Sequence, residues 1–170
     1  NSIMERRETY EHEVPKGGFC LTLSCDVQKT SLQTLVMAHG LKDEKWLISA
    51  DIIWGDPSEE YVWDELKKII LRPWSLHNGK EIPITASFID SGYLTPQVYK
   101  FCKLMQPHRV FATKGVGGQG RPAVGRPSRS NSQKLPVIPI GVNGLKEVLF
   151  NRLKVTEPGP AYIHISHDFD

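Results

Sequence analysis

The sequence predicts one α/β domain in which helices flank a central mixed sheet. Three observations lead to this expectation. Three β-prone segments follow one another with short connections, further apolar strands alternate with helices, and 170 residues are the length of one domain. The chain is 39% hydrophobic and 24% charged, which is usual for a globular protein. No apolar run reaches the length of a membrane span.

The first 17 residues are polar and lack apolar periodicity, so we expect a linker or an arm on the outside of the fold. The domain itself is then residues 18–170. Cys20 and Cys25 lie five apart in a predicted strand, where their side chains face opposite ways. They are therefore poor disulfide or metal partners. With Cys102 far off in the sequence, we expect free thiols in a reducing compartment.

The first strands are predicted by their alternation and by a turn. Phe19–Asp26 alternates apolar and polar side chains, which is typical of a strand with one buried face. Leu32–His39 and Lys45–Trp54 are two further β-prone runs, and residues 40–44 between them predict a hairpin turn. Three sequential strands with short connections predict an antiparallel meander.

Strands and helices alternate in the rest of the chain. Ser58 is a plausible N-cap for a helix that Pro73 stops. Ile84–Asp90 is an apolar strand, and a helix over residues 95–105 follows, with Thr95 as its cap and Pro96 at its first position. The remaining predicted elements are a strand at Arg109–Thr113, a strand at Leu135–Val142, a helix at Leu145–Leu153 and a strand at Ala161–Ser166.

Two acidic residues follow apolar strands directly. Asp26 ends the first strand and Asp90 ends the strand after the first helix. An acid in this position is costly to desolvate unless it is paired or binds a cation. Two of them on neighbouring strand ends would make an oxygen-rich site suited to Mg²⁺ or Mn²⁺. Asp also caps turns where strands end, and spacing alone supports both interpretations equally.

The predicted order of elements favours the metal site. A β-β-β-α-β core places the first strand beside the fourth, which brings Asp26 and Asp90 to the same edge of the sheet. This is the ribonuclease H-like arrangement, in which carboxylates hold two metals about 4 Å apart for phosphodiester hydrolysis. Such a site needs a third carboxylate, for which we choose Asp168 and hold Asp170 in reserve. Both lie at a chain end that could be frayed.

Basic residues gather in the second part of the chain. Residues 1–100 carry 11 Lys and Arg against 15 Asp and Glu, whereas residues 101–170 carry 10 against 4. A Gly/Pro/Ser-rich loop at residues 115–134 is unusually long, so it is either functional or disordered. Lys114 before it could stabilise charge at a scissile phosphate or simply be solvated. We expect contacts to DNA phosphates from Lys114, Arg121, Arg126, Arg129 and Lys134.

Two other features are given ordinary interpretations. Residues 115–120 fit a dinucleotide-binding glycine pattern, but Pro122 and Pro127 forbid the helix that this pattern needs behind it. The four tryptophans lie in predicted strands or the first helix or beside them. We expect them to pack in the core and on the surface rather than to stack on bases.

Several sequence runs together resemble a known family, the large terminase subunit of the GpA (lambda-like) phages. The resemblance covers roughly residues 6–168 and points to the C-terminal nuclease half of that subunit. The chain departs from the family pattern at residues 29–31 and at Tyr93, and neither departure removes a carboxylate. The runs that carry the resemblance are, in order, LTLSCDVQ, EKW, IIWGDP, SFIDSGYLTPQVYKFC, RVFATKG and GPAYIHI.

The resemblance implies a function as well as a fold. Such subunits pair an N-terminal packaging ATPase with a ribonuclease H-like endonuclease that cuts concatemeric viral DNA in the host bacterial cytoplasm. Asp26 and Asp90 match the family's strand-end acids, and Asp168 matches more loosely. The implied cofactors are two divalent ions, Mg²⁺ or Mn²⁺. The implied partners are double-stranded DNA, the small subunit, the portal and an ATPase domain whose phosphate-binding motif is absent from these residues.

Two other functions remain as alternatives. The first is a resolvase or transposase-type nuclease on the same fold, against which the ordered series of motifs argues. The second is a non-catalytic DNA-binding or assembly module that has lost its metals. Loss of Asp26 or Asp90 would favour this second alternative, and the sequence retains both.

Overall fold

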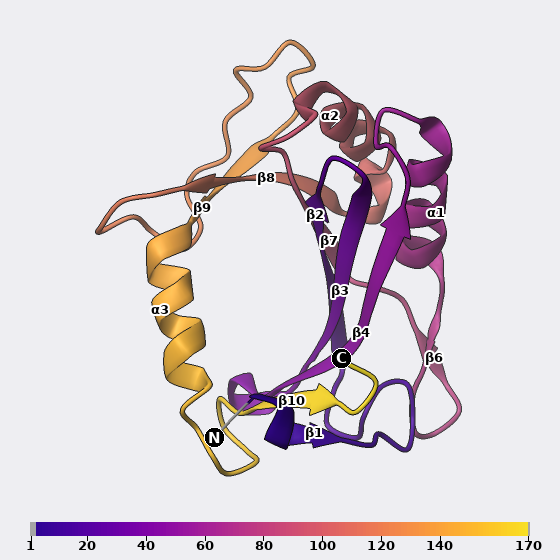
Figure 1. Ribbon diagram of the computed structural model, residues 1–170, viewed down its shortest axis with the longest axis vertical. Helices are drawn as coiled ribbons and strands as arrows, with labels where there is room; N and C mark the ends of the chain where they lie inside the picture. Colours follow the sequence, from indigo (N-terminus) through magenta and orange to yellow (C-terminus); the bar gives the residue numbers. More distant parts are fainter. Residues whose placement is uncertain (1–2, 170) are drawn as a thin grey trace.

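A computed structural model describes residues 3–169, and its main feature is an eight-stranded mixed sheet (Figure 1). No helix within these residues is long and apolar enough to cross a lipid bilayer. The strands lie in the order β1 (Arg7–Glu8), β10 (Ile163–Ser166), β4 (Lys45–Trp54), β3 (Ser31–His39), β2 (Cys20–Val27), β7 (Ala86–Asp90), β8 (Val110–Val116) and β9 (Val137–Gly141).

Other elements connect or cover these strands. A small antiparallel pair, β5 (Trp74–Ser75) and β6 (Glu81–Ile82), follows the first helix. The helices are α1 (Glu60–Leu71), α2 (Thr95–Leu104) and α3 (Val142–Arg152), and three single 3₁₀ turns are η1 (Ile3–Arg6), η2 (Leu41–Asp43) and η3 (Gln106–His108).

The predicted meander and fold class are confirmed. Strands β2, β3 and β4 pair antiparallel, while β7 lies parallel to β2 and is followed outward by parallel β8 and β9. The first strand of the meander therefore lies beside the strand that follows α1, as the element order predicts. This arrangement is an α/β fold consistent with the ribonuclease H-like class.

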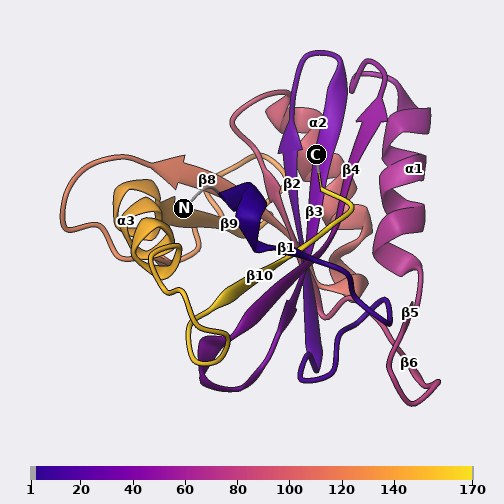
Figure 2. The ribbon, with the colours of Figure 1, turned by 60° about the horizontal axis from the view of Figure 1, so that its bottom comes forward.

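The core lies on one face of this sheet, under α1 and α2. Alternation along β2 explains this, because Leu21, Leu23 and Cys25 are buried while the residues between them are not. On the helices, Val62 and Val98 are fully buried in the same apolar cluster. Figure 2 shows α1 and α2 on one side of the sheet and α3 on the other.

Both predicted helix caps are wrong. Helix α1 has Glu59 at the N-cap position without a side-chain bond, and Ser58 lies in the turn before it, where its N–H donates to the Asp56 carboxylate at 2.8 Å. Helix α2 has Leu94 in a left-handed conformation (φ 46°) at its N-cap. Thr95 is already helical, and its hydroxyl donates to the Ser91 carbonyl at 2.7 Å instead. At α2 the turn before the helix thus uses the hydroxyl that was expected to cap it.

Part of the N-terminal segment takes part in the domain. Strand β1 pairs with β10 at the edge of the sheet, where Arg7 aligns with Ile165. Val14 is fully buried, and its N–H donates to the Ser75 carbonyl at 3.1 Å. These contacts join the beginning of the chain to its last strand.

The long loop between β8 and β9 folds back along β9. Gly125 donates to the Pro139 carbonyl at 2.8 Å, and Gly141 donates to the Ala123 carbonyl at 3.1 Å. Glycine is needed at both positions, since a Cβ on Gly141 would lie 2.4 Å from the Pro122 carbonyl oxygen. The loop is therefore hydrogen-bonded to the sheet edge along part of its length.

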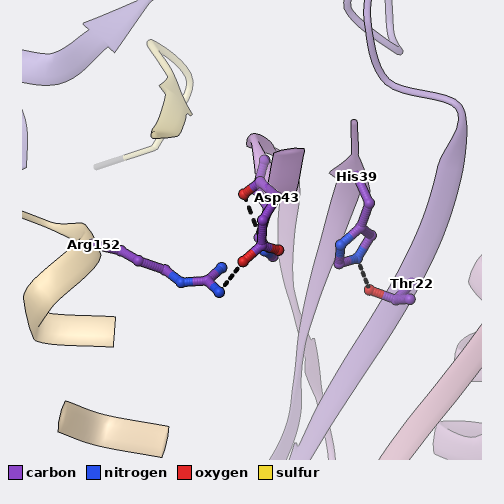
Figure 3. Close-up of polar contacts among 5 residues, drawn as sticks. Thr22, His39, Asp43 and Arg152 are labelled. Atoms are coloured by element: carbon purple, nitrogen blue, oxygen red, sulfur yellow. Dashed lines mark hydrogen bonds and ion pairs between the residues drawn. The ribbon is translucent and has the colours of Figure 1, made fainter. Parts of the chain in front are cut away.

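Helix α3 is held mainly by its two ends. It begins directly after β9, and none of its residues is buried. At its far end Arg152 forms an ion pair with Asp43 of η2 (Figure 3). The Arg6 guanidinium donates to the carbonyls of Leu153 and Val155 just beyond the helix. Slight burial raises the pKa of Asp43, but hydrogen bonds from Lys45 and Arg152 outweigh this effect and lower that pKa.

Candidate active site

Two carboxylates lie side by side on neighbouring parallel strands. Cys25 of β2 aligns with Ile89 of β7, so the next residues, Asp26 and Asp90, are neighbours. Neighbouring strands are about 4.8 Å apart. Cys25 and Ile89 are buried under the helices, and the alternation of strands turns both aspartates to the opposite, open face. The sequence-predicted pair is thus brought together by register.

Each of these carboxylates also has one local hydrogen bond. The Gln28 side-chain amide donates to Asp26, and the Gly92 backbone N–H donates to Oδ1 of Asp90 at 3.2 Å. An ionised carboxylate has about four lone-pair sites, so one such bond leaves it able to accept a cation. The turn-capping and cation-binding interpretations are therefore compatible at both residues. Sequence reasoning missed Gln28, although its position two residues after Asp26 is a local signal.

The pair lines a cavity of about 1120 Å³ on the open face of the sheet. Register arranges its floor in rows: Asp26 aligns with Gln33 of β3, which aligns with Ile52 of β4. A second row, one pleat away on the same face, consists of Phe88, Ser24, Leu35 and Ala50, all of which line the cavity. The floor is mostly apolar or neutral, so the two acids are its main charged feature.

Asp168 lines the same cavity and is exposed. Its Oδ2 accepts a hydrogen bond from the Ser166 hydroxyl at 3.3 Å, and its backbone N–H donates to Oγ of Ser166, also at 3.3 Å. Within the described residues, however, no three acidic, His or Cys side chains come together closely enough to hold a metal ion. Asp168 therefore shares the cavity with Asp26 and Asp90 without completing a cluster. Asp170 lies outside the described residues.

Strand β10, which ends two residues before Asp168, is anchored through a buried histidine. Both ring nitrogens of His164 face carboxylates, Glu8 at Nδ1 and Glu44 at Nε2, the latter at 2.7 Å. The ring also stacks on Trp46, with centroids 4.8 Å apart. Its partners lie 156 and 120 residues away, so no local pattern in the sequence signals the contact.

Asp51 is a further acid at the cavity that sequence reasoning did not single out. It aligns with Thr34 of β3, which aligns with Cys25 of β2. The register therefore assigns Asp51 to the helix-covered face, opposite to Asp26. Its Oδ2 accepts a hydrogen bond from the Ser49 hydroxyl at 2.9 Å. This placement separates it from the aspartate pair.

The thiol beneath the pair is held neutral. Burial first, and then the negative charge of Asp26, raise the pKa of Cys25, and Asp90 adds to this effect. The thiolate is the form that binds metals and attacks electrophiles. Cys25 therefore acts as a small apolar core residue, and the chemistry of the cavity depends on oxygen ligands.

The basic residues lie apart from the aspartate pair. Thr113 of β8 aligns with Asp90, so the next residue, Lys114, belongs to the opposite face. Lys114 lines a separate cavity of about 240 Å³, together with Tyr99 of α2. The register therefore separates Lys114 from the aspartate pair. The loop residues Arg121, Arg126, Arg129 and Lys134 are all exposed, and none forms an ion pair within residues 3–169.

Comparison with known proteins identifies relatives of the whole chain. The model of the family described as "Terminase large subunit gpA, endonuclease domain" matches residues 1–170. The chain is 30% identical to the terminase large subunit of Escherichia phage lambda over 173 aligned positions, covering 99% of this chain. It is 26% identical to the terminase large subunit of Enterobacteria phage P21, covering 93% of this chain.

These matches cover only part of each relative. The chain spans 27% of the length of the lambda protein and 25% of that of the P21 protein. No solved structure was found that matches the chain.

Proposed function

The chain belongs to the endonuclease-domain family of the terminase large subunit gpA, and we propose that it hydrolyses phosphodiester bonds of double-stranded DNA. The observation that carries this proposal is the adjacent pair Asp26 and Asp90 on the exposed face of the sheet. Two carboxylates at this spacing repel one another unless a cation neutralises them. A nuclease of this type uses such a cation to bind the phosphate.

Divalent metal ions fit the pair. Carboxylate oxygens are the ligands that Mg²⁺ and Mn²⁺ prefer, and the open cavity leaves room for a phosphate. We propose that Asp26, Asp90 and Asp168 would hold two such ions between them. Asp168 has to move closer for this, because no three-residue cluster exists within residues 3–169. When bound, the ions supply an activated water and stabilise the leaving 3′ oxygen.

The residues of the chain itself orient and admit the substrate. Gln28 and the Gly92 backbone hold the two carboxylates through one oxygen each. Gln33 and Ile52, which continue the row of Asp26 across the sheet, give a floor without further charge. The negatively charged DNA backbone is then repelled by the carboxylates alone, and bound cations remove this repulsion.

The remaining parts of the proposal concern DNA and the full-length protein. We propose that Lys114 and the basic loop contact phosphates without reading sequence. In the whole subunit, the domain would cut concatemeric DNA beside an ATPase domain of the same chain, in the host bacterial cytoplasm. The small subunit and the portal are its proposed partners. The relatives that support this step are themselves terminase large subunits.

The first prediction tests the aspartate pair by plasmid nicking. With Mn²⁺ or Mg²⁺ the chain should relax supercoiled plasmid, and Asp26→Ala or Asp90→Ala should slow nicking by about 100-fold or more, since a bound metal supplies several kcal/mol of transition-state stabilisation. Asp51→Ala is the matched control, because Asp51 is an acid at the same cavity on the other face. It should leave the rate within about twofold.

The same experiment also tests the alternative of a non-catalytic module. The lack of a three-carboxylate cluster in residues 3–169 favours a non-catalytic DNA-binding or assembly module. That function is supported if the chain retains DNA but nicks no plasmid. Equal nicking by all variants would instead contradict the catalytic role of Asp26 and Asp90. Calorimetric titration of Mn²⁺ into the chain and into Asp168→Ala then reports whether Asp168 is a third ligand.

A further inference from the structure

We propose that Trp54 and Lys29 form a binding surface for an unpaired nucleotide of DNA, next to the aspartate pair. This inference rests on the proposed function and names a further part of its substrate site. Stacking of a base on an aromatic ring and contact of a cation with the neighbouring phosphate are the two interactions by which proteins hold unpaired nucleic acid.

Trp54 is unusual in its exposure. Its side chain is 69% exposed, whereas Trp46, Trp63 and Trp74 are between 4% and 7% exposed. It makes no ring contact within residues 3–169. An exposed indole leaves a large apolar surface in water, which is unfavourable unless a ligand covers it.

The register places Trp54 on the same face as the aspartate pair. Asp26 aligns with Gln33 and Gln33 with Ile52, and Trp54 is two residues further along β4. Two strand spacings and two residue spacings put its Cα about 12 Å from that of Asp26. Ile52, 49% exposed, lines the cavity of the pair and continues the apolar surface toward Trp54.

The tip of the β2–β3 hairpin, which carries Lys29, lies next to the end of β4 that carries Trp54. Trp54 aligns with Ser31, and the N–H of Gly55 donates to the Thr30 carbonyl at 2.9 Å. The exposed Lys29 precedes these residues directly. Lys29 and Trp54 thus supply a charge for a phosphate and a flat surface for a base within one small region.

The chemistry selects an unpaired nucleotide. Bases inside an intact duplex are stacked on one another, so an indole can stack only on a base at a nick, an end or an unstacked step. Such bases arise at the position where a phosphodiester is cut. The continuity of Ile52 and Trp54 with the cavity of the pair favours nucleic acid over a protein partner.

The experiment measures tryptophan emission and oligonucleotide binding without metal. A short single-stranded oligonucleotide is added to the chain in EDTA, so no cleavage occurs. We expect it to quench the emission of Trp54. Trp54→Ala should weaken single-stranded binding by about 5- to 150-fold, the range of one base stacked on an aromatic ring. Binding of intact duplex should change less than twofold.

Phe19→Ala is the matched control. Phe19 is an exposed aromatic residue, 60% accessible, and the alternation of β2 places it with Leu21 on the helix-covered face. It should leave both affinities unchanged, and thermal unfolding should show that both variants remain folded. Lys29→Gln should weaken single-stranded binding and make it less dependent on salt.

The outcomes separate this inference from the proposed function. Asp26→Ala should retain the quenching, so a chain that never nicks plasmid can still support the binding surface. Unchanged Trp54 emission on adding the oligonucleotide overturns the inference and leaves a protein contact as the explanation of the exposed ring. An equal loss of binding in Phe19→Ala overturns it as well.

Discussion

Asp26 and Asp90 show how one residue can serve both a turn and a cation. Each carboxylate accepts one hydrogen bond from a residue two positions later, which fixes the local turn. The remaining lone pairs face the cavity side of the sheet, where register brings the two groups together. The cost of crowding two negative charges is met by a bound cation in the proposed function. Their negative charges also raise the pKa of the buried Cys25 thiol beneath them.

At this scale, we predict that the native chain reacts with a thiol reagent at Cys20 alone. Burial raises the pKa of Cys102 to about 12, and burial with the charge of Asp26 raises the pKa of Cys25, so neither forms the reactive thiolate at pH 8. Cys20 is only half-buried. Colorimetric titration should find one fast thiol, and Cys20→Ser should remove it.

The same thiols predict a change of stability with pH. Both folded pKa values lie above the unfolded value of about 8.5. The contribution of these two thiols to the free energy of unfolding is therefore complete below pH 8.5 and is lost as the pH rises toward 12. Rapid labelling of all three thiols in the native chain at pH 8 contradicts this account of the core.

Among the elements, β10 is short and depends on side chains for its position. It aligns with β4 over three residues and with β1 over two. His164 reinforces both edges, because its two nitrogens face Glu8 beside β10 and Glu44 before β4. Asp168 follows four residues later, so this contact determines where the proposed third ligand lies.

We predict that His164→Gln lowers the free energy of unfolding by about 2–3 kcal/mol, because glutamine cannot contact both carboxylates at once and loses the stacking on Trp46. His39→Gln is the matched control. His39 lies on β3, one strand beyond β4, and shares one hydrogen bond, with Thr22 at 2.7 Å (Figure 3). Its substitution should cost about 1 kcal/mol.

Urea unfolding measures both values, and hydrogen exchange locates the change. The amides of residues 163–167 should exchange faster in His164→Gln than in His39→Gln. Equal losses of stability in the two variants argue that His164 contributes only as an ordinary buried ring.

In the whole molecule, the sheet separates two unlike faces. Helices α1 and α2 cover one face and enclose the core, while the other carries the aspartate pair and its cavity. The basic loop extends from the β8–β9 edge, and α3 continues from that edge to the far end of the molecule (Figure 1). DNA that reaches the pair from the open side would pass this edge, which carries the four exposed loop cations.

We predict that neutralising the loop weakens duplex binding and flattens its dependence on salt. Replacing the four loop cations by Gln should lower the slope of log affinity against log salt by about 3–4, as expected for four lost phosphate contacts. The matched control removes four exposed lysines from the helix side. The residues changed are Arg121, Arg126, Arg129 and Lys134 in the loop, and Lys67, Lys68, Lys80 and Lys100 in the control.

Filter binding from 50 to 200 mM salt measures both slopes, within the range over which such contacts are sensitive. Identical slopes in the two variants show that net charge, rather than the position of the loop, governs binding.

Local patterns in the chain were sufficient to predict most helices and strands and the aspartate pair. Alternation along residues 19–26 depends only on neighbours two apart, and strand order follows from short connections that limit where each strand can pair. The helix caps were wrong because Asp56 and the turn before Thr95 offered competing hydrogen bonds. Helix α3 was predicted correctly as a helix, but not as one without buried residues.

Periodicity and neighbours along the chain were enough to predict the fold class, the family resemblance and the two acids at strand ends. The face that each side chain occupies follows from how the strands pair, which needs the three-dimensional structure. Lys114 is one residue beyond the partner of Asp90, so it lies on the opposite face of the sheet. Trp54 is two residues beyond Ile52, so it lies on the same face as the aspartate pair. The contacts of His164, formed across more than 100 residues, likewise depend on how distant strands meet.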